Sequence, residues 1–377
     1  MTEIPQIHGT TAPGFEPVRE VLAALWDGTD EIGAAFAVEI DGKPVINLHA
    51  GWTTPKRETE WAADTIVPVF STGKAITALV MGWLKDQGHF SFTDKVADHW
   101  PAFAQAGKAD VTIAQALSHQ AGLSGIAEDM QASDWFDREL IEEKLAAQDP
   151  LWPLGKGTGY HPITFGFIAD AIARRTDGRT IGEILKAEIA GPRGLDFFVG
   201  TPESEHHRVA EHKLPPKPPV LGEMNEIKKI AFLKPWSSPG RRGAVDWRKA
   251  EFPAANGHGS ASGIAALMGI FANEGKLGGE PLIAPETIAE IMTEQVSGQD
   301  RVLPFDLSFG MGVMRNRNSG HYGPEPGAVG HYGLGGSCGF ADPVRHISGS
   351  YTPNRLREVL AGDPRAVKLI NAVYGCL

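Results

Sequence analysis

The residues that could carry chemistry begin with a serine and a lysine three positions apart, because residues 71–74 read Ser-Thr-Gly-Lys. At the start of a predicted helix this spacing places Ser71 and Lys74 on one face. A serine becomes a nucleophile when a base takes its proton, and a buried lysine with a lowered pKa can be that base. The alternative interpretation is a helix-capping serine beside a solvated lysine.

A tyrosine is the second candidate, within residues 157–162, which read Gly-Thr-Gly-Tyr-His-Pro. Tyr160 follows a glycine-rich approach and precedes a predicted helix, so we expect it to project from a loop into a cleft. A tyrosine beside a lysine can shuttle the serine proton, because a cation favours the phenolate. The alternative is an ordinary loop tyrosine that packs its ring.

A glycine-rich strand is the third candidate, because residues 330–337 read Gly-His-Tyr-Gly-Leu-Gly-Gly-Ser. Glycines let another backbone or a substrate approach a strand closely. A backbone N–H of this strand could therefore face an oxyanion together with that of Ser71. A similar Gly-His-Tyr-Gly at 320–323 runs into Pro-Glu-Pro, so we favour the later copy, and a plain glycine-rich hairpin is the alternative.

The order of these three segments resembles the serine β-lactamase and penicillin-binding-protein superfamily, and more specifically the β-lactamase-like esterases called family VIII carboxylesterases. Segments at 94–96, 116–123 and 330–343 support the resemblance, which covers about residues 15–350. It implies an α/β (α+β) fold of the β-lactamase/transpeptidase type, with an antiparallel sheet flanked by helices, a helical domain, and the active site between them.

The resemblance also implies roles for individual residues. Ser71 would be the nucleophile, with Lys74 and Tyr160 as a coupled base. The triplet His331, Tyr332 and Gly333 would take the place that Lys-Thr-Gly holds in β-lactamases. The residue after it, Leu334, would give the second oxyanion N–H.

Two departures from the family pattern bear on the substrate. Pro162 stands where β-lactamases have an asparagine, and His331, largely neutral at pH 7, stands where they have a lysine. Both changes remove polar recognition of an anionic amide, so they favour neutral esters. We therefore expect a serine hydrolase that cleaves short-chain carboxylic esters. The alternatives are a β-lactamase, a D-amino-acid peptidase or an acyltransferase on the same fold, or a non-catalytic penicillin-binding-like module.

A competing pattern occurs at residues 335–339, where Gly-Gly-Ser-Cys-Gly matches the Gly-x-Ser-x-Gly nucleophile elbow of α/β-hydrolases. That fold needs an acid and a histidine on later strands. After Ser337 only Asp342 and His346 are available, and both follow too soon. His119, which invites a Ser-His-Asp interpretation, is predicted to have a structural role.

The predicted elements form a sheet domain with an insertion. A helix over 15–27 and a hairpin around Asp41-Gly42 come first, and a second helix covers 72–87. Helical patterns recur at 111–118, 135–147, 164–175, 181–189, 261–275, 285–294 and 365–374, and strand patterns lie between 309 and 340. We predict one discontinuous domain over 1–95 and 256–377, and a helical insertion over 96–255 that ends in a proline-rich cover segment, 201–255.

Composition limits the function classes. The chain has 377 residues, a net charge of −11 and only two cysteines. An acidic chain without a basic stripe is not expected to bind nucleic acid, and no Cys/His spacing predicts a metal, so no cofactor is expected. Residues 1–8 lack a signal pattern and no apolar run reaches about 18 residues, so we expect no membrane partner and a cytoplasmic location. A small-molecule ester is the expected partner, and the oligomeric state stays open.

Overall fold

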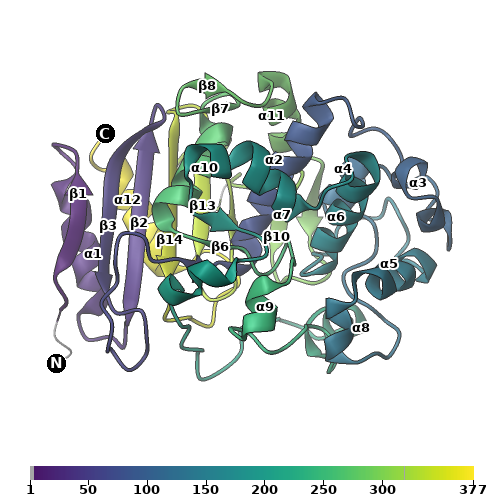
Figure 1. Cartoon of the computed structure of the whole chain (residues 1–377), viewed down its shortest axis with the longest axis horizontal. Coiled ribbons are helices and arrows are strands. Elements are labelled where there is room, and N and C mark those ends of the chain that lie inside the picture. The colour runs from purple at the N-terminus through teal and green to yellow at the C-terminus, as the bar shows by residue number, and fades with distance from the viewer. Residues whose placement is uncertain (1–3, 318) are drawn as a thin grey trace.

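A nine-stranded antiparallel sheet forms the centre of the computed structural model, which describes residues 4–317 and 319–377 (Figure 1). Residues 1–3 of the N-terminal segment considered above lie outside this range. The strand order is β1-β3-β2-β14-β13-β12-β11-β10-β9. The bounds are β1 (Ile7–Thr11), β2 (Gly33–Ile40), β3 (Lys43–Gly51), β9 (Val296–Gln299), β10 (Asp306–Phe309), β11 (Met314–Arg315), β12 (Val329–Tyr332), β13 (Cys338–Asp342) and β14 (Ile347–Pro353).

Helices cover both faces of this sheet. The helices are α1 (Glu16–Ala23), α2 (Gly73–Asp86), α3 (Val96–His99), α4 (Ile113–Leu117), α5 (Arg138–Ala147), α6 (Thr164–Thr176), α7 (Ile181–Ile184), α8 (Glu226–Lys228), α9 (Val245–Lys249), α10 (Ala261–Ala272), α11 (Pro285–Met292) and α12 (Pro364–Tyr374). On one face α10 packs against β2, β13 and β14, while α1 and α12 pack together within the cluster on the other. None of the described helices is long and apolar enough to cross a membrane.

Helix α2 joins the sheet to the helical part of the molecule. It packs against α6, α10 and α11, and α3 to α6 lie beyond it at the end of the molecule away from β1 (Figure 1). Two small sheets complete the strands: β4 (Val67–Pro68), β5 (Phe197–Phe198) and β6 (His258–Gly259) form one, and β7 (Lys276–Leu277) and β8 (Glu280–Pro281) the other. The β4 strand leads directly to Ser71, so the small sheet supports that segment.

The structure confirms the main predicted elements. The hairpin turns at Asp41 and Gly42, whose φ angles of 52° and 68° are those that a two-residue type I′ turn requires. The predicted helices at 15–27, 72–87, 164–175 and 365–374 are present with small shifts of their ends. Strands β1 and β14 were not predicted, and β14 is a central strand, paired with both β2 and β13. The domain division at residues 95 and 256 stays a prediction.

Candidate active site

Ser71 lies at the exposed start of a buried helix. A single helical turn, Phe70–Thr72, leads into α2, and Ser71 is partly exposed while Thr72, Gly73 and Lys74 are buried. Phe70 has a φ of 47°, a left-handed conformation that is strained for a residue with a side chain. Such strain concentrates at functional sites, and here it precedes the predicted nucleophile.

Lys74 is fully buried and reaches the serine. Its Nζ lies 3.1 Å from Ser71 Oγ, 2.8 Å from the Pro162 carbonyl oxygen and 3.0 Å from that of Ala254. Burial lowers the pKa of the ammonium group well below its ordinary value. A neutral amine has two N–H groups and one lone pair. The two carbonyls accept both N–H groups, so the lone pair is left for the Ser71 hydroxyl.

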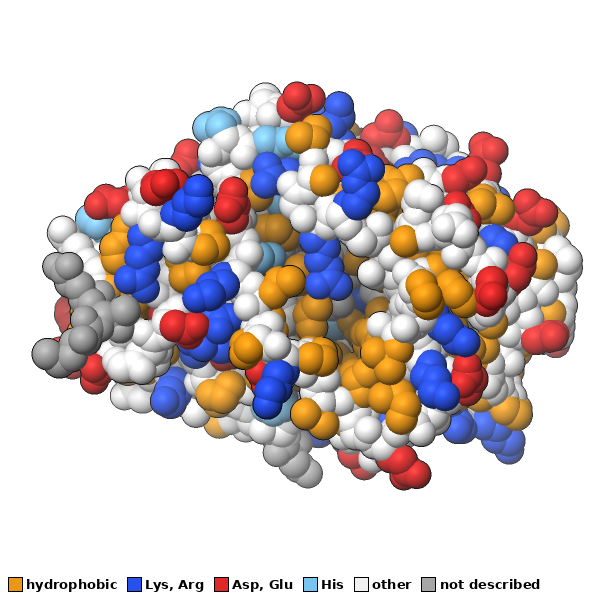
Figure 2. All heavy atoms as spheres, turned by 90° about the horizontal axis from the view of Figure 1, so that it is seen from below, with side chains coloured by type: hydrophobic (Ala, Val, Ile, Leu, Met, Phe, Trp, Pro, Cys, Tyr) orange, Lys and Arg blue, Asp and Glu red, His pale blue; other side chains and the backbone are white. Residues whose placement is uncertain are grey.

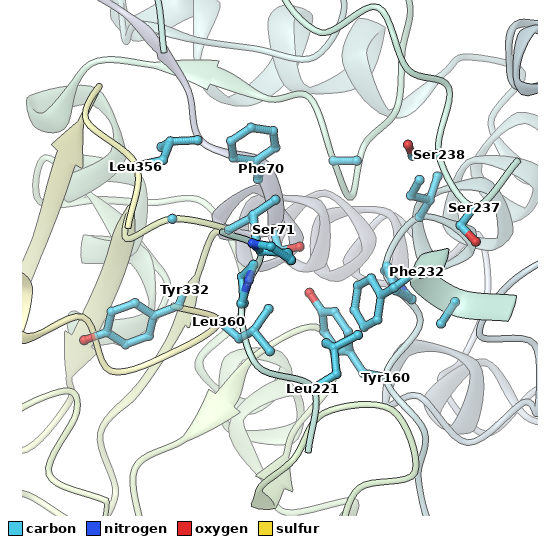
Figure 3. Close-up of a pocket in the computed structure, with 18 of the residues that line it drawn as sticks. Phe70, Ser71, Tyr160, Leu221, Phe232, Ser237, Ser238, Tyr332, Leu356 and Leu360 are labelled. Carbon is cyan, nitrogen blue, oxygen red and sulfur yellow. The ribbon is translucent and has the colours of Figure 1, made fainter. Parts of the chain in front are cut away.

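Tyr160 completes this group from the loop that precedes α6. Its hydroxyl points toward the Ser71 side chain in Figure 3, and its interaction with the serine lowers the pKa of the phenol. The centre of its ring lies 4.7 Å from Lys74 Nζ. The backbone N–H of Tyr160 donates to Asp300 Oδ1 at 3.1 Å, and the same oxygen accepts the N–H groups of Val302 and Leu303. Asp300 thus ties the tyrosine loop to a loop far along the chain.

The surroundings of Tyr160 act on the protonation of its hydroxyl. Burial raises the pKa of its hydroxyl above the usual range, although the hydrogen bond with Ser71 opposes this. A cationic lysine beside it would favour the phenolate instead. Burial lowers the pKa of Lys74 and raises that of Tyr160, so it favours the neutral form of both groups. The role of the pair as a coupled base stays a prediction.

The glycine-rich strand lies beside the serine, but its residues face different ways. His331 is buried, its Nδ1 hydrogen-bonds the Tyr332 carbonyl at 2.8 Å, and burial lowers its pKa to about 3, so it is neutral. It lies under Tyr160, with 5.9 Å between the ring centres, and not in the lining of the cleft. A Cβ on Gly333 would stand 2.1 Å from the Val69 carbonyl oxygen, so only glycine lets this strand approach the Ser71 segment.

Leu334 offers a free donor next to the serine. The flanking N–H groups are engaged, that of Gly333 with the Ser337 carbonyl at 2.8 Å and that of Gly335 with the Val359 carbonyl at 3.1 Å. Across residues 4–317 and 319–377, the N–H of Leu334 has no backbone acceptor. Leu334 and Ser71 line the same cleft, so this N–H is available to an oxyanion.

Ser71, Tyr160 and Leu334 border a mostly apolar cleft of about 410 Å³. This volume is in the size range of small-molecule sites. In Figure 3, Phe70, Leu356, Phe232 and Leu221 surround Ser71 and Tyr160. The cover segment predicted from its prolines supplies much of the lining: Leu214, Pro215, Lys217, Pro218, Pro219, Leu221, Ala231, Phe232, Leu233, Ser237, Ser238, Pro239, Arg242, Trp247 and Ala255.

The serine of the competing pattern is a structural residue. Ser337 is buried, and its hydroxyl donates to the Val69 carbonyl at 2.8 Å and contacts Thr72 Oγ1 at 3.0 Å. It lies in the turn between β12 and β13, both antiparallel strands, and not between a parallel strand and a helix. The α/β-hydrolase alternative is therefore wrong, and Ser337 fastens the segment on both sides of Ser71.

His119 also has the predicted structural role. It is buried, its Nδ1 accepts the N–H of His161 at 3.1 Å, and its carbonyl accepts the N–H of Gly159 at 3.2 Å. Its ring lies 4.8 Å from that of Tyr160. Because the Nδ1 atom is an acceptor, this histidine holds the Tyr160 loop from beneath without touching Ser71.

Three groups of the site could not be predicted from the sequence. The Pro162 carbonyl accepts a hydrogen bond from Lys74 at the position where β-lactamases have an asparagine, and the Ala254 carbonyl does the same from a segment 180 residues away. Backbone acceptors leave no residue-type signal. The contact of Asp300 with Tyr160 was also not predicted, because no sequence pattern near Asp300 indicates it.

Comparisons with known proteins agree with this geometry. A family model described as Beta-lactamase matches residues 18–372. A penicillin-binding protein homologue from Caulobacter crescentus has a TM-score of 0.96 and 47% identity over 99% of this chain and 100% of that chain. A family VIII carboxylesterase has a TM-score of 0.93 and 39% identity over the same shares of both chains. The esterase/beta-lactamase LipL of Mycobacterium tuberculosis is 33% identical over 93% of this chain and 83% of its own length. The resemblance predicted from three short segments is thus confirmed.

Proposed function

Because this chain belongs to the beta-lactamase family, we propose that it is a serine hydrolase that cleaves short-chain carboxylic esters through an acyl-enzyme on Ser71. One observation carries the proposal. A fully buried Lys74 lies 3.1 Å from Ser71 Oγ, and two carbonyl oxygens occupy its other hydrogen-bonding positions. A lysine held in this way is available as a base at neutral pH.

The first half of the reaction forms the acyl-enzyme. Lys74 takes the Ser71 proton while Oγ attacks the ester carbonyl, and the N–H groups of Ser71 and Leu334 hold the oxyanion. The new ammonium group donates to the Pro162 and Ala254 carbonyls with two N–H groups and passes its third proton through the Tyr160 hydroxyl to the leaving alkoxide. The carbonyl–alkoxide bond breaks and the acyl group stays on Ser71.

The second half repeats these steps with water. Lys74, neutral again, takes a proton from the attacking water, and the acid product leaves as the proton returns to Ser71. No metal or cofactor takes part in this scheme.

Esters are favoured as substrates by the cleft and by the relatives. The cleft is mostly apolar, and neither Pro162 nor the buried, neutral His331 places a charged side chain at the scissile bond. Two relatives at 39% and 33% identity are named as esterases. The name of the second also includes β-lactamase, so β-lactam hydrolysis is the second candidate.

Initial rates on 4-nitrophenyl butyrate test the proposal. Wild-type protein should hydrolyse the ester, and S71A should lose at least about 10⁴-fold in kcat/KM. A chromogenic cephalosporin tests the lactam alternative, and an added alcohol acceptor tests acyl transfer. Hydrolysis that survives in S71A would refute the nucleophile, and no turnover by wild type would favour a non-catalytic module.

The cytoplasmic location predicted from the sequence stays a prediction. Cys338 and Cys376 are unpaired, which agrees with a reducing compartment.

A further inference from the structure

The cleft carries a charge opposite to that of the chain. In the described part of the molecule its charged lining residues are Lys217, Arg242 and Arg357, with no carboxylate. The surrounding stretch, residues 213–249, holds nine lysines and arginines against three acidic residues, although the whole chain has a net charge of −11. Figure 2 shows a face with a central hollow, around which basic and hydrophobic side chains gather.

One of the three cations is already neutralised. Arg357 Nη1 donates to Asp30 at 2.7 Å and Nη2 to Glu31 at 3.2 Å. These two carboxylates balance the charge of Arg357, so Arg357 contributes little to the binding of a ligand.

Arg242 has no such partner. Within residues 4–317 and 319–377 no carboxylate lies within ion-pairing distance of its guanidinium, and the group lies over the ring of Phe70, 5.4 Å from the ring centre. Phe70 is the residue before the nucleophile. The side chain is exposed, yet loss of water within the hollow lowers the pKa of its guanidinium. A guanidinium that lines the cleft without a carboxylate partner is free to form charge-assisted hydrogen bonds with an anion.

Lys217 lines the same cleft and is also without an acidic partner among the described residues. The neighbouring Arg241 differs, because it is paired with Asp246 at 2.6 Å and does not line the cleft. Arg241 therefore forms an ion pair within the fold, whereas the adjacent Arg242 lines the cleft.

We propose that the esters this protein cleaves carry a carboxylate, which Arg242 binds with assistance from Lys217. The proposal rests on the esterase function above and names its substrate class. Arginine forms bidentate hydrogen bonds with a carboxylate, so it fixes both charge and orientation. The neutral His331 had indicated neutral esters, but Arg242 supplies the missing cation from the cover segment, farther from the scissile bond.

Matched pairs of esters test this. On the leaving-group side, 4-carboxyphenyl butyrate is compared with 4-carbamoylphenyl butyrate. On the acyl side, 4-nitrophenyl hydrogen adipate is compared with the ester of adipic acid monoamide. Within each pair the size and shape are nearly the same and the main change is the charge; in the first pair the carbamoyl compound also has the slightly better leaving group, which works against the expected preference. The wild-type protein should prefer the carboxylate by about tenfold in kcat/KM in at least one pair, since a hydrogen bond to a charged group has about this effect.

Two variants separate the proposal from general charge effects. R242Q should reduce the carboxylate-to-carboxamide ratio at least about fivefold, through KM more than kcat, and K217Q by a smaller factor. R241Q is the control, because it removes an adjacent charge outside the cleft, and it should keep the wild-type ratio. The wild-type preference should also shrink in 0.5 M salt.

Three results would overturn the proposal: equal rates within both pairs, a preference that survives in the R242Q/K217Q double variant, or the same loss in R241Q. Each of them leaves ester hydrolysis itself intact. If wild type cleaves none of the four esters, nor 4-nitrophenyl butyrate, the proposed function fails as well, so the two failures are distinguishable.

Discussion

Two fully buried lysines are held by backbone carbonyls in different parts of this molecule, and only one of them touches a serine. Lys108 Nζ, in the helical part, donates to the carbonyls of Gln105, Ala146 and Gln148 at 2.9, 3.0 and 2.5 Å. Lys74 has two carbonyls, and the hydroxyl of Ser71 stands in the third place. Burial lowers the pKa of both groups.

The difference shows what makes a buried lysine a base. A carbonyl oxygen can only accept, so the three around Lys108 need three N–H groups, which only the ammonium form has. The two carbonyls around Lys74 need only two N–H groups, which the neutral amine also has. The Ser71 hydroxyl can then donate to the lone pair of that amine. The lowered pKa is common to both lysines, whereas the number of pure acceptors around them differs, and this difference supports Lys74 as the proposed base.

The largest effects are expected from removing the amine of each lysine. K74M should lower kcat/KM on 4-nitrophenyl butyrate by about 10³-fold, because Ser71 loses its base. K108M should instead destabilise the protein by about 3 kcal/mol, since three buried carbonyls lose their donors, with kcat of the folded protein nearly unchanged. Kinetics and urea unfolding of both variants check this. Equal activity losses in the two would contradict the distinction.

The Tyr160 hydroxyl should matter less than the base. Y160F keeps the ring over Lys74 but removes the relay to the leaving group, so kcat should fall about 10²-fold. The loss should be greater for a poor leaving group such as an alkyl ester than for 4-nitrophenyl butyrate. The same loss for both substrates would contradict a role in protonating the leaving alcohol.

The pH profile tests the neutral state of Lys74. Activity requires the neutral amine, so kcat/KM should rise with pH as Lys74 loses its proton. Because the pKa of Lys74 is lowered, kcat/KM should reach its plateau at a pH far below 10.5, the ordinary pKa of a lysine. Tyr160 must keep its proton, and its raised pKa places the alkaline decline above 10. A rise centred near 10.5 would show that Lys74 is an ordinary, charged lysine in the free protein.

The smallest effect is expected at the second serine near the site. S337A removes the hydroxyl that fastens Val69 and Thr72, so kcat/KM should fall about three- to tenfold while most activity is retained. S350A is the control, because Ser350 is buried in β14 and its hydroxyl has no hydrogen-bond partner among the described residues. A loss in S337A as large as in S71A would reinstate Ser337 as a nucleophile.

Local patterns explain which parts of the fold could be predicted. The hairpin around Asp41 and the helix over 164–176 follow from short-range turn and periodicity signals. Strand β14 reads Ile-Ser-Gly-Ser-Tyr-Thr-Pro and is buried along its whole length. Its hydroxyl residues alternate with Ile, Gly and Tyr, a pattern typical of a strand with one solvent-facing side. Its central position, buried on both faces against α10 and the opposite cluster, therefore depends on packing that the sequence does not display.

The candidate site also contains residues that the sequence predicts and residues that it does not. Ser71, Lys74 and Tyr160 were found because their spacing and order resemble a known family. Asp300 and the Ala254 carbonyl act across 140 and 180 residues, and no local pattern marks them. Arg242 lies in an irregular proline-rich stretch, where only the folded cleft shows that it, and not Arg241, faces the substrate space.

Covalent labelling can identify the nucleophilic serine of this protein. The wild-type protein, S71A and K74M are treated with a fluorophosphonate probe, and the adducts are measured by intact mass and located by peptide mapping. We predict one adduct on wild type, on the peptide that contains Ser71, with none on S71A and much slower labelling of K74M. An adduct on the Ser337 peptide, or an unlabelled wild-type protein, would contradict the account.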